Sequence, residues 1–397
     1  MTLSLGNGPY QETLATALMG RNMLSRVLRI SPQPEVLDPD GAGSLMLVKR
    51  FPSYRFAQRL FWGLWRRIPG TGHSSLPVVA TSWLADRLLS EWVLPSRIFH
   101  GWSGLCLASL TTAKGQGAVS VVENPTLHPR RWQAAVMEEC ERFNLHPRDC
   151  VSILPEALIR RCEREYKICD RIVVLSSRAG QSFEELGYAQ KVCVVWPGVD
   201  HDVFVPPVER VSPNRFRVCY VGRMELAKGL PYLLQAWKSL ALPEAELVLV
   251  GEVRHEADLV LKQHQSPSVR IMGLLSRSSV AEIYRSSNVF VFPSVNEGFG
   301  LALLEAMASG LAVIATDRSG ATDCVSEGKD GFVVPARSAD ALAEAILWCY
   351  RHRDETMAMG GAARKKVEAR FTLAHYEQRQ IDLYHSLVGT KAATATQ

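Results

Sequence analysis

The chain has 397 residues, of which 47% are hydrophobic and 21% are charged. These proportions exclude a disordered or fibrous protein, and the length predicts two domains that can each bury a core. The net charge of +5 lies in the first half, because residues 1–200 carry 23 basic and 18 acidic side chains while residues 201–397 carry 22 of each. This excess is too small for a dedicated nucleic-acid-binding protein, but it indicates an anionic partner for the first half.

The first half predicts short strands that alternate with helices. A strand over Thr2–Leu5 is followed by Gly6-Asn7-Gly8 and by a helix over Tyr10–Leu28. Further strands are predicted at Arg97–His100, Ala118–Val122, Arg171–Leu175 and Val192–Val195, with helices at Arg130–Phe143, Pro155–Ile168 and Arg178–Leu186.

The second half repeats this alternation more regularly. Strands are predicted at Phe216–Val221, Leu247–Val250, Val269–Met272, Val289–Phe292 and Ala312–Ala315, with helices at Leu230–Leu240, Leu301–Ala308 and Ala339–Tyr350. Alternation of this kind is typical of βαβ units around a parallel sheet, which bind ligands at the carboxyl ends of their strands.

The fold class is therefore α/β, with two domains. Pro197, Gly198, Pro206 and Pro207 mark the join, so the first domain covers residues 1–200 and the second covers residues 201–370. Residues 371–397 are expected to form a helix, about Thr372–Leu387, followed by a polar tail.

The most informative stretch is residues 293–310, PSVNEGFGLALLEAMASG. Glu297 follows a strand, and the amides of Gly298, Phe299, Gly300 and Leu301 are expected to be unpaired at a helix start, where they can bind an anion. Glu305 lies about one turn into that helix. Two carboxylates beside a phosphate cradle suit a sugar nucleotide, although a solvated surface position explains either glutamate alone better.

Two cations follow the first strand of the second half. Gly222 and Arg223 come directly after that strand, and Lys228 precedes the next helix. Both cations can reach a diphosphate at the carboxyl edge of the sheet, where charge-assisted hydrogen bonds are strong. A solvated loop at the start of a helix explains either cation equally well on its own.

Together these residues resemble the retaining family 4 glycosyltransferases of GT-B fold, over about Phe216 to Val388. The resemblance rests on Gly222-Arg223, Lys228-Gly229 and the Glu297/Glu305 pair, and also on Gly328-Lys-Asp-Gly331 and Pro197-Gly198-Val199-Asp200. It implies two Rossmann-like domains that face each other across a cleft, an acceptor-binding domain over residues 1–200 and a donor-binding domain over residues 201–370, with the C-terminal helix returning to the first domain. It also implies transfer of a sugar from a nucleotide-diphosphate-sugar co-substrate, with retention of anomeric configuration and without a metal or other cofactor.

The resemblance also implies roles for individual residues. Arg223 and Lys228 neutralise the leaving diphosphate, Glu297 and the following amides hold the donor sugar, and Glu305 binds the ribose. Gly8 lies in the family's glycine-rich first loop, and Ser319-Gly320-Ala321 borders the donor pocket. The family often carries an active-site histidine after a strand of the first domain. His128 and His100 compete for that role, and Asn124 lies on the same acceptor side.

Other motifs in the sequence allow different interpretations. The triplets Asp38-Pro-Asp40 and Asp200-His-Asp202 resemble metal sites of GT-A enzymes but read as turns. Gly6-Asn7-Gly8 lacks the third glycine of a nicotinamide-binding loop. A non-catalytic sugar-nucleotide-binding module of the same fold remains the alternative function, and Glu297 favours the enzyme. Residues 49–67, with six cations and no acid, suit either an anionic membrane surface or a core-packing helix.

The sequence thus predicts a bacterial glycosyltransferase of envelope polysaccharide or exopolysaccharide synthesis, with a saccharide or lipid-linked acceptor. No CxxC pair, signal peptide or apolar run of 18 residues occurs in the chain. We therefore expect a cytoplasmic protein that can touch the inner face of the membrane through residues 49–67 and does not bind nucleic acid.

Overall fold

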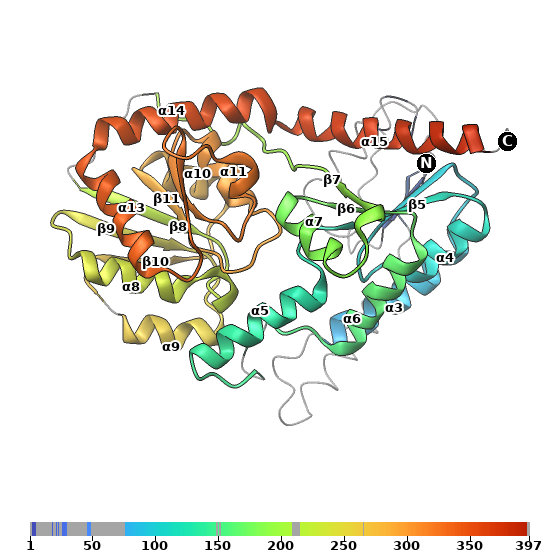
Figure 1. Ribbon diagram of the computed structural model, residues 1–397, viewed down its shortest axis with the longest axis horizontal. Coiled ribbons are helices and arrows are strands. Elements are labelled where there is room, and N and C mark those ends of the chain that lie inside the picture. Colours follow the sequence, from blue (N-terminus) through green and yellow to red (C-terminus); the bar gives the residue numbers. More distant parts are fainter. Residues whose placement is uncertain are drawn as a thin grey trace.

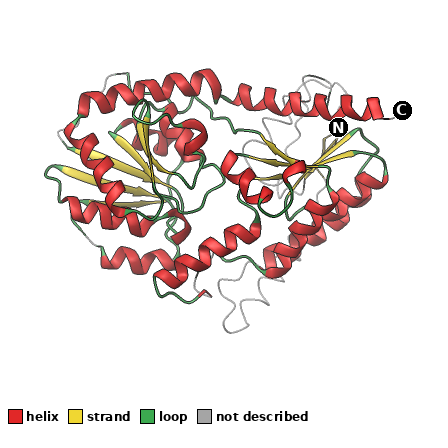
Figure 2. Cartoon of the chain, in the orientation of Figure 1, coloured by secondary structure: helices red, strands yellow, loops and turns green. Residues whose placement is uncertain are grey.

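The computed structural model describes residues 2–4, 18, 21, 23, 26–29, 46–48, 76–147, 150, 152–208, 215–264 and 266–394. The chain forms two α/β domains side by side (Figure 1), and each is a parallel sheet flanked by helices (Figure 2). This arrangement confirms the predicted fold class.

The first sheet has seven strands in the order β3-β2-β1-β4-β5-β6-β7, all paired in parallel. In that order the strands are Met46–Val48, Arg26–Arg29, Thr2–Ser4, Ile98–Trp102, Val119–Asn124, Arg171–Val174 and Val192–Val194. The central strands β4 and β5 are buried along almost their whole length, as expected for a parallel sheet that is covered on both faces.

Helices cover both faces of this sheet. On one face lie α3 (Leu76–Leu89), η1 (Ser90–Trp92), α4 (Leu107–Gly115), α6 (Glu156–Ile168) and α7 (Ser177–Glu184), which share a core with β4, β5 and β6. On the other face Tyr376, Ile381 and Tyr384 of α15 (Leu373–Thr394) pack on the same strands. A short turn, η3 (Ala189–Lys191), leads into β7.

The second sheet has six parallel strands in the order β10-β9-β8-β11-β12-β13. In that order they are Val269–Gly273, Ala245–Val250, Phe216–Val221, Val289–Phe292, Ala312–Thr316 and Gly331–Val334. From β8 the following strands β9 and β10 extend to one side of the sheet, and from β11 the strands β12 and β13 extend to the other. In sheets of this kind a ligand binds in the crevice between the carboxyl ends of the two central strands, here β8 and β11.

The helices of the second domain also form two layers. One layer contains α8 (Leu230–Leu240), α9 (His255–Gln263) and α13 (Ala339–Arg351), and the other contains α10 (Arg277–Arg285), α11 (Leu301–Ala308), α12 (Ala321–Cys324) and α14 (Arg353–Arg370). The turn η4 (Leu226–Lys228) leads into α8. Helix α8 begins and ends at the residues that the sequence predicts.

The chain crosses between the domains near their edge. Val199 forms a parallel bridge with Thr372, and the amide of Val199 donates to the carbonyl of Phe371 at 2.8 Å. Helix α14 then lies over the second domain and α15 over the first (Figure 1). The segment that enters the second domain at Val199 and the segment that leaves it at Thr372 therefore lie side by side.

A third connection is made by α5 (Pro129–Arg142), a helix of the first half that packs on the second domain. Its residues Trp132, Val136 and Cys140 belong to one buried core together with Tyr232 of α8. In Figure 1 this helix bridges the two domains below the sheets. Hydrophobic packing therefore couples the domains on the side opposite to α14 and α15.

Two predictions about elements are wrong. Residues 26–28 lie in β2, so the helix expected over Tyr10–Leu28 cannot extend to its predicted end. The strand expected to end at Val122 continues through Glu123 and Asn124, because both residues pair with β6 and are buried. Most of residues 5–25, together with residues 49–67 and Asp38–Asp40, lies outside the described residues.

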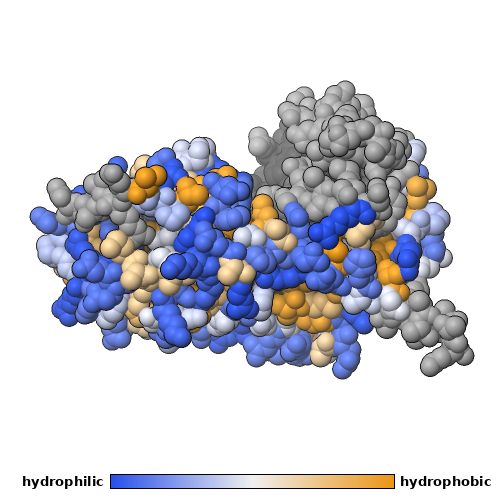
Figure 3. Space-filling model, turned by 90° about the horizontal axis from the view of Figure 1, so that it is seen from above, coloured by the Kyte–Doolittle hydropathy of each residue, from blue (hydrophilic) through white to orange (hydrophobic). Residues whose placement is uncertain are grey.

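Among the described residues, no helix is both long and apolar enough to cross a membrane. Figure 3 shows that hydrophilic residues cover most of the described surface on the face it presents, with small hydrophobic areas between them. Membrane contact through residues 49–67 stays a prediction.

Candidate functional site

The loop between β11 and α11 places Glu297 at the carboxyl edge of the second sheet. The Glu297 amide donates to the carbonyl of Arg318 at 3.0 Å, which ties this loop to the one after β12. Glu297 is only 8% exposed. A carboxylate at this depth needs a partner, because a buried unpaired charge is expensive.

Lys228 provides that partner. Its Nζ donates a hydrogen bond to Glu297 Oε2, and the two side chains are 12% and 11% exposed. The structure therefore joins two predicted site residues that lie 69 positions apart in the chain. A bound phosphate could replace this contact, because the ammonium group of lysine has three donors.

Gly298 lies where the two domains meet. A Cβ at this position would stand 2.0 Å from the carbonyl oxygen of Pro125, in the loop after β5. The Ser176 hydroxyl, at the start of α7, donates to the carbonyl of Gly298. Only glycine permits this approach, so the first domain rests directly on the start of α11.

The start of α11 has no side-chain cap. Gly300 has φ of +93°, a left-handed conformation that favours glycine, and Phe299 is buried in the core behind it. The Gly298 amide donates to Glu297 Oε1 at 3.2 Å, so this amide is not unpaired as the sequence suggested. Leu301 is the first residue of the helix, whose dipole favours an anion at this end.

Arg223 stands at the end of β8 and remains accessible. Its side chain is 53% exposed and lies 3.5 Å from Glu225, which is buried. Tyr220 donates to the Arg223 carbonyl at 2.7 Å and fixes the turn that contains Gly222. The guanidinium lies at the same sheet edge as Lys228.

Glu305 lies farther along α11 in an apolar setting. Burial raises the pKa of its carboxyl group, while Arg277 and a hydrogen bond from Tyr284 act in the opposite direction. The Tyr284 hydroxyl lies 3.3 Å from Glu305 Oε2. This carboxylate is placed to accept hydrogen bonds from hydroxyl groups, as the predicted ribose contact requires.

His128, the first acceptor-side candidate, is buried inside the first domain. Its ring packs against Tyr166, Phe183 and Tyr188, and its Nδ1 accepts the Arg130 amide at 3.2 Å and so caps α5. Burial lowers the pKa of His128 to about 4. These contacts describe a neutral histidine that holds the start of α5.

His100, the second candidate, joins the first sheet to α15. Its Nδ1 lies 2.7 Å from the Tyr384 hydroxyl and its Nε2 lies 3.1 Å from Glu123. Gln380 of α15 contacts the same carboxylate at 3.5 Å. Because His100 is 1% exposed, its visible role is to dock the C-terminal helix.

Asn124 shapes the loop that touches the second domain. Its Nδ2 donates to the carbonyls of Thr126 at 2.7 Å and of Leu127 at 3.1 Å. These bonds hold residues 125–127 against Gly298. Asn124 therefore acts on the site through the loop.

The acidic triplet that the structure describes is a turn. Asp200 Oδ1 accepts the amides of Asp202 and Val203, and Asp200 Oδ2 pairs with Arg277 at 3.4 Å. Within the described ranges, no group of three or more His, Cys, Asp or Glu side chains could hold a metal ion. Gly8 lies outside those ranges, so its place in the donor site stays a prediction.

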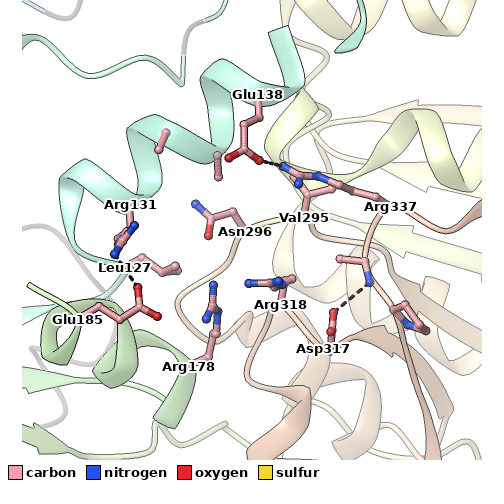
Figure 4. A pocket seen from close by; sticks show the side chains of 14 residues that line it. Leu127, Arg131, Glu138, Arg178, Glu185, Val295, Asn296, Asp317, Arg318 and Arg337 are labelled. Atoms are coloured by element: carbon pink, nitrogen blue, oxygen red, sulfur yellow. Dashed lines mark hydrogen bonds and ion pairs between the residues drawn. The ribbon is translucent and has the colours of Figure 1, made fainter. Parts of the chain in front are cut away.

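A cavity of about 610 Å³ opens between the domains beside this site. Helices α5 and α7 form one wall, and the loops after β11, β12 and β13 form the other (Figure 4). Three of the lining residues point toward the centre of the cavity, namely Arg178, Asn296 and Arg318. The sequence did not identify any of them as a site residue. They come from three separate loops or helices, so no sequence spacing could have grouped them.

The fold is that of known two-domain glycosyltransferases. It matches sucrose-phosphate synthase from Thermosynechococcus elongatus with a TM-score of 0.66 and 19% identity, covering 98% of this chain and 99% of that one. HepE from Anabaena, crystallised with UDP and glucose, matches with a TM-score of 0.66 and 16% identity over 97% and 99%. The class is therefore GT-B, an α/β fold of two Rossmann-like domains.

Residues 206–366 match the model of the family described as glycosyl transferases group 1. D-inositol 3-phosphate glycosyltransferase of Corynebacterium urealyticum is 29% identical over 57% of this chain and 59% of its own length. The core mannosyltransferase LpcC of Rhizobium leguminosarum is 32% identical over 55% and 65%. The matched part thus covers less than two thirds of each of these relatives.

Proposed function

We propose that this chain is a retaining glycosyltransferase that takes a sugar from a nucleotide-diphosphate-sugar donor. The observation that carries the proposal is the Lys228–Glu297 contact at the uncapped start of α11, where the first domain rests on Gly298. A cation, a carboxylate and a helix start at one point suit a diphosphate and the hydroxyls of the sugar attached to it.

In the proposed reaction, Lys228 and Arg223 stabilise the charge that develops on the leaving diphosphate. Glu297 and the amides at the start of α11 orient the donor sugar, and Glu305 accepts hydrogen bonds from the ribose. Preorganised charges in a site that excludes water provide the electrostatic stabilisation, so no metal is needed in this scheme. The acceptor enters from the first domain and attacks on the face that the diphosphate leaves.

The acceptor is proposed to be a saccharide or lipid-linked glycan of a bacterial envelope or secreted polysaccharide. Two relatives support this setting by name: LpcC, a lipopolysaccharide core enzyme, and CapM of Staphylococcus aureus, a capsular polysaccharide enzyme that is 29% identical over 44% of this chain. A cytoplasmic location with peripheral membrane contact belongs to the same proposal.

A thermal-shift screen against nucleoside diphosphates and their sugars tests the proposal, because a ligand that binds only the native state raises the melting temperature. We expect at least one nucleoside diphosphate to do so. Proton NMR of the transfer product should then show the donor's anomeric configuration. An inverted product would refute retention, and the absence of any nucleotide response would refute the donor class.

A further inference from the structure

The interdomain cavity contains two arginines without acidic partners. Its other arginines are neutralised, since Arg131 pairs with Glu185 at 3.0 Å and Arg337 pairs with Glu138 at 2.7 Å. Arg178 and Arg318 have no carboxylate within ion-pair distance in the described part of the chain. Figure 4 shows both guanidiniums pointing into the cavity from opposite walls.

The local environment does not compensate these two charges. Burial and then the charge of Arg318 lower the pKa of Arg178, against the opposing effect of Glu185 and Asp317. The Nε of Arg178 is buried without a hydrogen-bond partner, and one of its terminal nitrogens donates to Gln181 at 2.9 Å. Arg178 and Arg318 therefore repel each other, and neither has an ion-pair partner within the described residues.

An independent third group points into the same space. Asn296 is only 2% exposed, and its Nδ2 has no hydrogen-bond partner. An unpaired buried amide is unfavourable unless a ligand or a water molecule accepts its hydrogen bond. Asn296 directly precedes Glu297, so a ligand that reaches it lies next to the proposed donor site.

We propose that Arg178, Arg318 and Asn296 bind an anionic oxygen group, phosphate or carboxylate, on the acceptor substrate. Arginine suits either group because its planar donors can form two parallel hydrogen bonds to them. The cavity, at about 610 Å³, is large enough for a charged sugar rather than a bare ion. This inference rests on the proposed function and specifies its acceptor as an anionic one.

The site is made by both domains. Arg178 belongs to α7 of the first domain, whereas Arg318 and Asn296 belong to loops of the second. The carbonyl of Arg318 also accepts the Glu297 amide. An anion held between the two arginines therefore joins the domains and places the acceptor beside the donor carboxylate.

Calorimetric titration with inorganic phosphate at constant ionic strength tests the site. We expect Arg178→Gln and Arg318→Gln each to weaken phosphate binding by about tenfold, the usual effect of one charge-assisted hydrogen bond. Lys329→Gln removes the same charge from an exposed turn away from the cavity and should bind like the wild type. Arg318 is exposed, so its replacement should not unfold the protein.

A second comparison separates this site from the donor site. Arg223→Gln should keep phosphate binding but weaken the response to nucleoside diphosphates. If Arg223→Gln abolished phosphate binding while Arg318→Gln retained it, the phosphate would occupy the donor site and the inference would be wrong. If the wild type bound phosphate but responded to no nucleoside diphosphate, the proposed function would be contradicted instead.

Three sugars identify the anion. We expect glucose 6-phosphate or glucuronate to bind more tightly than methyl α-glucoside. Tighter binding of glucose 6-phosphate would indicate a phosphorylated acceptor, and tighter binding of glucuronate would indicate a uronic acid. The preference should disappear in Arg318→Gln. Equal binding of all three sugars to the wild type would overturn the proposal.

Discussion

Glu297 is the residue on which the donor site depends most directly. Its carboxylate contacts Lys228 and stands beside the amide of Gly298, so it can orient a sugar and hold the ammonium group of the lysine in place. Sequence spacing predicted that these residues share a sheet edge, because parallel strands end together. It could not predict their direct contact, which depends on the loop between β11 and α11.

Replacement of Glu297 tests this role. We expect Glu297→Ala to lower the turnover number by about a hundredfold or more, as the loss of a preorganised polar contact does in other active sites. Release of nucleoside diphosphate from the donor measures the effect. Glu344→Ala, which removes an exposed carboxylate from α13, is the control, and equal activity of the two variants would contradict the assignment.

The pH dependence of stability tests the environment of His128. Its pKa is lowered from 6.5 to about 4 in the folded state, so between these values the unfolded chain binds more protons. Stability that is present above pH 6.5 is therefore lost as the pH falls toward 4, by up to about 3 kcal/mol.

Urea unfolding at several pH values measures this contribution. The stability difference between wild type and His128→Gln should shrink by that amount from pH 7 to pH 4. Parallel curves for the two proteins would show that His128 titrates normally and is more open to the cleft than the structure indicates.

At the scale of elements, the second domain followed its sequence pattern closely. Strand β8 and helices α8 and α11 begin and end where their hydrophobic runs predicted. The first domain did so less well, since β2 replaces the end of a predicted helix. Residues 26–29 read RVLR, and a run this short is compatible with helix or strand until its neighbours in the sheet are known.

The contact between α11 and the loop after β5 is the main point where elements of the two domains meet at the site. Gly298→Ala would place a Cβ 2.0 Å from the Pro125 carbonyl and force the loops apart. We expect a loss of turnover of about a hundredfold, because small misplacements of reacting groups are costly.

Nucleoside diphosphate binding by Gly298→Ala should stay within about threefold of the wild type, because donor contacts lie in the second domain. Steady-state kinetics and calorimetry measure the two quantities separately. Gly361→Ala, in α14 with open space around its Cα, is the matched control. Normal turnover in Gly298→Ala would show that the contact is not needed for transfer.

At the scale of the whole molecule, α5 links the domains through a buried carboxylate. Glu139 is fully buried and accepts the Tyr232 hydroxyl at 2.9 Å and the Arg337 Nε at 2.6 Å, both from the second domain. The sequence placed Glu139 on a predicted helix of the first half. It gave no sign that this helix packs on the other domain, because an apolar helix face does not specify its partner.

Loss of this link should be measurable in the intact chain. We expect Glu139→Ala to destabilise the protein by about 2–3 kcal/mol, because buried Tyr232 loses its acceptor and Arg337 keeps only its contact with Glu138. Urea unfolding gives the change. Glu141→Ala, on the exposed side of the same helix, should change stability by less than about 0.5 kcal/mol. Equal effects of the two changes would contradict the coupling.

The central claim is that Lys228, beside Glu297, binds the diphosphate of a nucleotide sugar. Calorimetric titration of the nucleoside diphosphate that responds best in the thermal screen tests it most directly. We predict one site per chain in the wild type and binding about tenfold or more weaker in Lys228→Ala, since one charge-assisted hydrogen bond is lost. Unchanged affinity in Lys228→Ala, with a native unfolding curve, would contradict the account.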